Sequence, residues 1–405
     1  MNTSDKARIL MIGAGWEQLA LVETIKKQGH YLVATHPSIQ GEGLKIADQY
    51  YVKDSRDVAG HISIAQSHRV NAIITDNCDY SFYSASIVAA KLGLPFASIQ
   101  SALYSNDKYA QRVCVSQTTV KQPIFVKIQT IEQLYAAIAK IGFPSILKPV
   151  DSRGTFGVTI IGNIETLETA YFDAISNSPS RTLIYEQFIT GTLVTVDGLC
   201  FSNGHQSLTV ASRKFDSGPK PVTKEIIYPA LFDSSVNNAL MQTHHTVATA
   251  LNYQYGHTHG EYLLTPNNQI YLVECTNRGG GVYTSSVIVP LLTGLPTNEI
   301  LLNQSLGTDT YITDNKGFDF MKCSVMLTFL DYEVGKVIDA INTDEMKQKP
   351  YTVRFRSKYG INDMVESIEN GAGRHSMLVI GGKNTNDVMN NLQSFKETFK
   401  IIYHK

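Results

Sequence analysis

The stretch GEYLLTPNNQIYLVECTNRGGG, residues 260–281, contains two apolar β-type runs that flank Asn267-Asn268. A pair of turn-forming residues between two such runs predicts a β-hairpin. The hairpin places Glu261 on one strand and Glu274, thirteen positions later, on the other. Two adjacent carboxylates repel each other and favour a divalent cation, and their oxygen atoms suit Mg²⁺. The segment therefore predicts a metal site, with a solvated hairpin of surface acids as the alternative.

An arginine and three glycines, Arg278 and 279–281, follow the second strand of this hairpin almost directly. A rigid guanidinium at that point can neutralise the charge that builds up on a transferring phosphoryl or acyl-phosphate group. The surface-acid alternative explains the arrangement poorly, because an apolar strand carries Glu274 toward the arginine. We therefore predict that Arg278 stands beside the metal site.

A second segment, ILKPVDSRGTFGV at residues 146–158, begins as a β-type run that ends at Lys148. Gly154 and Gly157 bracket the loop that follows and let the backbone approach a ligand with its N–H groups. A cation together with backbone donors suits a triphosphate. The segment does not fit the P-loop, because that loop runs into a helix and this one runs into another strand. The alternative is an exposed hairpin with an incidental lysine.

The run that ends at 186–189, Glu-Gln-Phe-Ile, precedes Gly191 and reads as the end of a strand. An extended backbone beside an aromatic side chain can pair with the edge of an adenine whose ring is held between apolar side chains. The signal is weak alone, because many strand ends have this composition.

The first strand-to-helix turn, GAGWEQ at residues 13–18, falls short of a dinucleotide fingerprint. That fingerprint needs G-x-G-x-x-G and an acidic residue at the end of the second strand. Here Gln18 replaces the third glycine, and the second strand ends at His36. The sequence therefore favours a tight turn over NAD binding, and a substrate role for the turn stays open.

Two groups of basic residues leave two interpretations each. Arg213-Lys214 precede FDSGPKPVTK, residues 215–224, and form either a solvated loop or a pair that reaches phosphate beside a closing loop. Arg374 is either a surface arginine or a clamp for a substrate carboxylate.

The histidines predict no transition-metal site. His244-His245 lie in an expected helix with no partner at i+4, and His257 and His259 lack a third ligand nearby in the sequence. We expect His259, just before Gly260-Glu261, to be the one that approaches a substrate pocket.

The composition is that of an ordinary globular protein. The chain has 405 residues, of which 43% are hydrophobic and 18% charged, so two or three domains are expected. A formal net charge of −1 argues against nucleic acid or an anionic membrane as partner. Five dispersed cysteines form no CxxC pair, and we find neither a signal peptide nor an apolar run long enough to span a membrane. We expect a cytoplasmic protein.

The pattern of apolar runs divides the chain into four parts. Strands alternate with helices over 1–105, which predicts a doubly wound parallel sheet, with 94–98 as its fourth strand. The part at 106–190 begins with a helix entered through Asn106 and mixes strands with helices. The part at 191–315 has strands with long connections, and 316–405 is a further α+β part.

In this order the segments resemble those of the ATP-grasp ligases, over about residues 8–400. NDKYAQRV, FPSILKPVDSRGTFGV, LIYEQFITG and EYLLTPNNQIYLVECTNRGGG are similar to the family's lysine helix, phosphate loop, adenine linker and metal strands. The N-terminal run and the VECTNRGGG ending look most like the carboxylate–amine and L-amino-acid ligase branch. The resemblance implies an α/β N-terminal domain at 1–105, an ATP-grasp fold of two α+β subdomains at 106–190 and 191–315, and a C-terminal α+β extension at 316–405.

The resemblance also implies a role for each matching residue. Lys108 and Lys148 would contact the ATP phosphates, which would be covered by Ser152, Gly154, Thr155 and Gly157. Adenine would be held by Glu186, Phe188 and Ile189. The metal, Mg²⁺ or Mn²⁺, would be bound by Glu261 and Glu274, with a third oxygen from Thr276 or Asn277. Arg278 would stabilise an acyl phosphate, and Lys214 would reach the γ-phosphate.

Two positions depart from the family pattern. The family's Gly-x-Glu, whose glutamate takes the ribose hydroxyls, is Gly191-Thr192-Leu193 here, and its Glu-x-Asn is Glu274-Cys275-Thr276. The resemblance implies an ATP-dependent ligase that joins a carboxylate, such as an amino acid, to an amine through an acyl phosphate. Carboxylation or phosphoryl transfer on the same scaffold, and a nucleotide-binding module without catalysis, are the alternatives. A homodimer is a family-level expectation.

Overall fold

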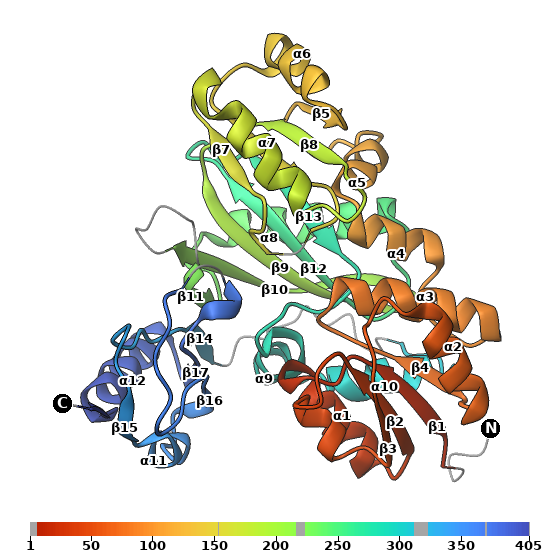
Figure 1. Cartoon of the computed structure of the whole chain (residues 1–405), viewed down its shortest axis with the longest axis vertical. Helices are drawn as coiled ribbons and strands as arrows, with labels where there is room; N and C mark the ends of the chain where they lie inside the picture. The colour runs from red at the N-terminus through yellow and green to blue at the C-terminus, as the bar shows by residue number, and fades with distance from the viewer. Residues whose placement is uncertain (1–5, 153, 216–222, 312–322, 369–370, 405) are drawn as a thin grey trace.

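The computed structural model describes residues 6–152, 154–215, 223–311, 323–368 and 371–404. In Figure 1 long central strands join three lobes: the N-terminal part, the part around residues 120–190, and the C-terminal part. Each lobe has its own sheet or its own stretch of a shared sheet.

The N-terminal lobe is a parallel sheet with the strand order β3-β2-β1-β4. Helices cover both faces, because one core contains α1 and α10 side chains and the other contains α2 and α3 side chains. This confirms the doubly wound arrangement. The strands are β1 (Arg8–Ile12), β2 (Tyr31–His36), β3 (Gln49–Val52) and β4 (Ala72–Ile74), and the helices are α1 (Leu19–Lys27), α2 (Val58–Ser67), α3 (Asp79–Leu92) and α10 (Thr297–Ser305).

Two sequence predictions in this region are wrong. Residues 94–98 form no strand, because they lead directly into α4 (Ile99–Asn106), whose first turn is capped by the Ser98 hydroxyl, which accepts a hydrogen bond from the Ser101 amide. Asn106 ends α4 instead of opening the next helix. Asp107 caps α5 (Lys108–Val115) by accepting a hydrogen bond from the Ala110 amide at 2.9 Å.

The second lobe is an antiparallel sheet of order β5-β8-β6-β7. Its strands are β5 (Phe125–Ile128), β6 (Ser145–Pro149), β7 (Thr159–Ile161) and β8 (Leu183–Gln187). Apolar side chains of α6 (Ile131–Ile141) and α7 (Leu167–Ser176) pack on it. The glycine loop connects β6 to β7, and Gly154 and Gly157 have the positive φ angles, 58° and 69°, that favour glycine.

An eight-stranded sheet of order β13-β12-β9-β10-β11-β14-β17-β16 runs through the centre and into the C-terminal part. The predicted hairpin is confirmed as β12–β13, with Asn268 at a φ of 58° in its turn. The strands are β9 (Thr192–Phe201), β10 (Gly204–Phe215), β11 (Thr223–Tyr228), β12 (His257–Leu264), β13 (Ile270–Thr276), β14 (Ser324–Thr328), β16 (Thr352–Ser357) and β17 (Ser376–Gly382).

Different helices pack on different strands of this sheet. α8 (Ser234–Ala250) packs on β9, β10 and β13, and the segment that leads into α9 (Val289–Thr293) packs on β11 and β14. The C-terminal part adds α11 (Thr343–Lys347), α12 (Thr385–Thr398) and a two-stranded sheet of β15 (Ile338–Ile341) and β18 (Ile401–Tyr403). Among the described helices, none is long and apolar enough to cross a membrane.

Candidate active site

The centre of the candidate site is the β12–β13 hairpin, which sets Glu261 opposite Glu274. Each carboxylate holds one cation. Glu274 lies 3.0 Å from Lys108 Nζ, and Glu261 lies 2.8 Å from a guanidinium nitrogen of Arg213. The sequence predicted the pairing of the strands but treated the two acids as unpaired. Their mutual repulsion is instead offset by cations from α5 and β10.

Lys148 belongs to a buried ion-pair group that contacts the hairpin, because Arg112 donates a hydrogen bond to the Val273 carbonyl. One Glu186 oxygen lies 2.7 Å from Lys148 Nζ, and the other accepts a hydrogen bond from Arg112 Nε at 2.8 Å. Burial alone raises the pKa of Glu186, but the two cations outweigh it and lower the pKa to about 2. The Glu186 side chain therefore faces these cations, which leaves its backbone, with Phe188 and Ile189, for the predicted adenine contact.

This buried group makes a prediction about stability. The pKa of Glu186 is lowered from its ordinary value of 4.5 to about 2, so the ionised carboxylate stabilises the folded state fully at pH values above 4.5. This contribution, about 3 kcal/mol, is lost as the pH falls toward about 2. Glu186→Gln should lower the free energy of unfolding at pH 7 by about 3–5 kcal/mol, because it leaves two buried cations unpaired. Denaturant unfolding as a function of pH measures both effects.

Asp54→Asn is a matched control for that experiment. Asp54 also pairs with an arginine, Arg56, at 2.9 Å, but both side chains are more than half exposed. Because exposed ion pairs contribute little, this variant should change the free energy of unfolding by less than about 1 kcal/mol. Equal losses in the two variants would contradict the assignment of Glu186 as a buried, stabilising partner.

The glycine loop contacts Lys108 through the residue at its start, Ser152. The Ser152 carbonyl accepts a hydrogen bond from Lys108 Nζ at 3.0 Å, so this lysine touches both the loop and Glu274. A Cβ at Gly154 would meet nothing, whereas one at Gly157 would lie about 3.0 Å from Pro149 and Asn177. Gly154 is therefore the open position of the loop, and Gly157 serves its packing.

Arg278 is held by the N-terminal lobe. Its Nε and one terminal nitrogen donate to the two oxygens of Asp79 at 2.8 and 2.9 Å. Asp76 accepts a hydrogen bond from the Gly279 amide at 2.7 Å, and Asn77 donates to the Gly280 carbonyl at 2.7 Å. These three residues follow β4, and the sequence interpretation assigned them no role. The sequence could have indicated a functional role for them, because they follow the carboxyl end of a parallel strand, where ligands bind in doubly wound sheets.

His259 lies beside Glu261, with its Nε2 3.8 Å from the Glu261 carboxylate, but it does not line the three cavities near the glycine loop. Its Nδ1 is 2.7 Å from buried Asp197, and its Nε2 is 3.2 Å from Arg213. Burial lowers the pKa of His259, but Asp197 and Glu261 outweigh it, so the pKa is raised overall. His259 therefore links the carboxylate site to the core of the sheet.

The structure does not bring every predicted residue to this site. Lys214 lies on β10 with the opposite orientation to Arg213, is 71% exposed and pairs with Glu225 at 3.4 Å. Arg213 occupies the position that the sequence assigned to Lys214, since successive side chains of a strand alternate between faces. The adjoining segment 216–222, predicted as a closing loop, lies outside the described residues.

The two candidates for a third metal ligand also differ in position. Thr276 lines the same narrow cavity as Glu274, and its hydroxyl donates to the His259 carbonyl at 3.3 Å. Asn277 is fully buried and donates to the carbonyls of Tyr255 and His257. Its side chain thus serves the core, because Asn277 follows Thr276 on the other face of the chain.

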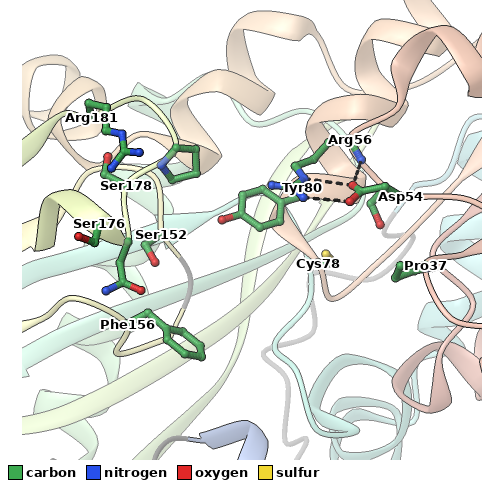
Figure 2. Close-up of a pocket in the computed structure, with 13 residues that line it drawn as sticks. Pro37, Asp54, Arg56, Cys78, Tyr80, Ser152, Phe156, Ser176, Ser178 and Arg181 are labelled. Atoms are coloured by element: carbon green, nitrogen blue, oxygen red, sulfur yellow. Dashed lines mark hydrogen bonds and ion pairs between the residues drawn. The ribbon is translucent and has the colours of Figure 1, made fainter. Parts of the chain in front are cut away.

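Three cavities surround these residues. A narrow one of about 20 Å³ is lined by Lys108, Ser152 and Glu274, and one of about 540 Å³ lies beside it and shares Arg278, Asp79 and Gly154 with it. Figure 2 shows a third, of about 610 Å³, with Arg56 and Tyr80 on one side and Ser152, Phe156 and Arg181 on the other. The glycine loop therefore borders all three.

The donor set can be compared with the needs of a cation. The described residues contain no group of three or more His, Cys, Asp or Glu side chains placed to hold a metal ion. Glu261 and Glu274 provide two adjacent carboxylates. Two carboxylates fit Mg²⁺, which keeps several waters and shares the phosphate oxygens of a nucleotide, better than a closed transition-metal site.

Comparison with known proteins supports the fold. A family model described as an ATP-grasp domain matches residues 141–286. Alanine–anticapsin ligase of Bacillus amyloliquefaciens is 24% identical over 244 residues, which cover 54% of this chain and 51% of the relative. The chain thus spans about half the length of the curated relatives it matches.

Solved structures agree over nearly the whole chain. The L-amino acid ligase of Bacillus licheniformis has a TM-score of 0.82 at 16% identity and covers 99% of each chain. The biotin carboxylase domain of the Hydrogenobacter thermophilus 2-oxoglutarate carboxylase, solved with MgADP, has a TM-score of 0.81 at 15% identity and covers 98% of this chain and 91% of that one. Residues 141–286 therefore match an ATP-grasp domain, and the whole chain shares the fold of these solved structures.

Proposed function

We propose that this protein is an ATP-dependent ligase that joins a carboxylate to an amine through an acyl phosphate. The observation that carries the proposal is the pairing of Glu261 with Glu274 beside Arg278, with a cation held on each carboxylate. This arrangement suits a metal-bound triphosphate at the carboxylates and a developing negative charge at Arg278. Carboxylate–amine chemistry is supported by the names of the L-amino acid ligase and the alanine–anticapsin ligase.

The two carboxylates and the phosphates of ATP would hold Mg²⁺, which would neutralise charge on the transferring phosphoryl group. Lys108 and Arg213 pair with those carboxylates in the structure, so both cations become available to phosphate oxygens when the carboxylates take a metal. Lys148, Ser152, Gly154 and Thr155 would complete the phosphate side of the site.

The reaction balances in two steps. A substrate carboxylate oxygen attacks the γ-phosphorus, the bond to the β-phosphate oxygen breaks, and ADP leaves. The nitrogen of a neutral amine then attacks the acyl carbon. Inorganic phosphate leaves with one oxygen of the former carboxylate and takes up the proton that the nitrogen loses. Arg278 would neutralise the charge of the acyl phosphate and of the tetrahedral species, and Asp79 would hold its guanidinium in place.

The two cations of β10 offer a test of this geometry. Arg213→Ala should lower kcat by about 10²–10³-fold, because it removes a cation aimed at the phosphates. Lys214→Ala should change kcat by less than about threefold, because the side chain is exposed on the other face of the strand. The reverse order of effects would return the role to Lys214.

The decisive experiment for the proposed reaction measures ADP release with ATP, Mg²⁺ and pools of amino acids and small carboxylates. Products are then identified by mass. ADP release that requires a pair of substrates, with a product equal to their sum less water, is the expected result. A product that contains bicarbonate carbon or phosphate, or ATP binding without ADP release, would replace this proposal with one of the alternatives.

We further propose a cytoplasmic location. All five cysteines are free, and burial raises the pKa of Cys200 to about 12 and also raises that of Cys275. Reduced, buried thiols are typical of proteins in a reducing compartment.

A further inference from the structure

The cavity of about 540 Å³ is the substrate side of the candidate site. It extends from the β1–α1 turn of the N-terminal lobe, through Trp16, to the start of β17, and it does not include Lys108 or Glu274. It meets the narrow phosphate-side cavity at Arg278, which lines both. A carboxylate that receives a phosphoryl group must therefore lie at the Arg278 end, with the rest of the substrates extending into the larger cavity.

Arg374 also lines this cavity. Its guanidinium carbon is 3.9 Å from the centre of the Phe329 ring, and one terminal nitrogen donates to the Thr223 carbonyl at 3.2 Å. Its Nε is buried and has no hydrogen-bond partner among the described residues. The side chain is thus fixed by stacking on one face, while part of its donor edge is unused.

The charge of Arg374 also lacks a counterion within the described part of the chain. The other cations of the cavity each have an acidic partner: Arg278 has Asp79, Arg356 has Glu42 and Lys358 has Glu366. No ion pair between described residues involves Arg374. Burial, and then repulsion by Arg213, lower the pKa of Arg374 to about 10, and attraction by Glu17 opposes this.

A half-buried guanidinium whose Nε lacks a partner and whose charge lacks a counterion is unfavourable until an anion reaches it. Its planar fork matches a carboxylate through two parallel hydrogen bonds, which a neutral or cationic group cannot form. The glycine loop borders the cavity of Arg374 through Gly154 and Thr155, but Lys108, Lys148 and Ser152 do not line it. We therefore assign the anion at Arg374 to a substrate.

We propose that Arg374 binds a carboxylate of the substrates other than the one that is phosphorylated. The inference rests on the proposed ligase function and names its substrate class: a pair of substrates that retains a free carboxylate in the product. That carboxylate belongs either to an amino acid that serves as the amine or to a dicarboxylate that serves as the acid.

The test compares each substrate found by product analysis with the same molecule in which the non-reacting carboxylate is a primary amide. The wild-type enzyme should show a KM about 10- to 100-fold lower for the acid than for the amide. Arg374→Gln should abolish this preference and leave the KM for ATP unchanged. The substrate whose acid is no longer preferred over its amide in Arg374→Gln is the one that supplies the carboxylate to Arg374. A preference retained in Arg374→Gln would overturn the proposal.

Two further variants separate binding from folding. Arg374→Lys keeps the charge without the fork, and should restore part of the preference for the acid. Arg354→Gln removes an exposed arginine of β16 outside this cavity, and should behave as wild type. Thermal unfolding shows whether Arg374→Gln is folded. If Arg374→Gln is unfolded, Arg374→Lys alone decides. The full wild-type preference for the acid in Arg374→Lys would overturn the assignment of Arg374 as the carboxylate fork.

A binding measurement keeps this inference distinct from the proposed reaction. Malonate, succinate and glutarate are added to the protein with ATP and Mg²⁺, and thermal unfolding is recorded. A rise in Tm that Arg374→Gln loses supports the subsite even where no ADP is released, and then only the ligase reaction fails. No rise in wild type, or an equal rise in both proteins, would overturn the subsite.

Discussion

Glu274→Gln should abolish ADP formation, with a loss of at least about 10³-fold in kcat. The amide keeps the shape of the side chain but removes one of the two charges that the hairpin places together. It also leaves Lys108 without its carboxylate at 3.0 Å, so this lysine should still meet the phosphates while the metal is lost. Steady-state ADP release at saturating ATP and Mg²⁺ measures the effect.

A binding experiment assigns that loss to the metal. The affinity of wild-type protein for ATP should fall when Mg²⁺ is removed with EDTA, whereas Glu274→Gln should bind ATP equally with and without Mg²⁺. Glu225→Gln is the control, because Glu225 pairs with Lys214 on the other face of β10. ADP formation at the wild-type rate in Glu274→Gln would remove Glu274 from the metal site.

Arg278→Ala should lower kcat by about 10²–10³-fold and weaken ATP binding far less. The guanidinium is expected to act on charge that develops during the reaction, and such a contribution appears in kcat. Arg278→Lys should recover only part of the rate, because an ammonium cannot make the two-point contact with Asp79. Pre-steady-state ADP formation and a separate ATP-binding measurement distinguish the two parameters.

Asp79→Asn supplies the matched control for the arginine. It keeps Arg278 and its charge but weakens the two hydrogen bonds that orient it. Its kcat should lie between those of wild type and Arg278→Ala. An unchanged kcat in Arg278→Ala would show that the arginine serves only to join the N-terminal lobe to the hairpin.

The sequence predicted the elements whose signal is local. The turn at Asn267-Asn268 marked the hairpin, although a bulge between Glu261 and Tyr262 is what brings Glu261 opposite Glu274. Gly154 and Gly157 marked the positive φ angles of the glycine loop. The alternation of strands and helices predicted the N-terminal sheet. β11 was missed because its strand character lies in a short run next to a proline-bearing loop, and α4 because its cap, Ser98, ends a run that reads as a strand.

The partners across the site could not be predicted in the same way. Asp79 and Arg278 are 199 residues apart, and Arg112 and Glu186 are 74 apart, so only the assembled fold brings them together. Within the pair Arg213-Lys214, and between the alternatives Thr276 and Asn277, the sequence could not tell which side chain faces the site. In a strand, an error of one residue moves a side chain to the opposite face.

The proposed reaction makes one demand that other reactions on this scaffold do not meet. The carboxylate substrate is labelled with ¹⁸O at both oxygens and incubated with ATP, Mg²⁺ and the amine found by product analysis. The account predicts inorganic phosphate that carries one ¹⁸O and an amide that keeps the other, since the acyl phosphate passes one carboxylate oxygen to phosphorus. Unlabelled phosphate, with the second ¹⁸O found instead in AMP or in water, would contradict it.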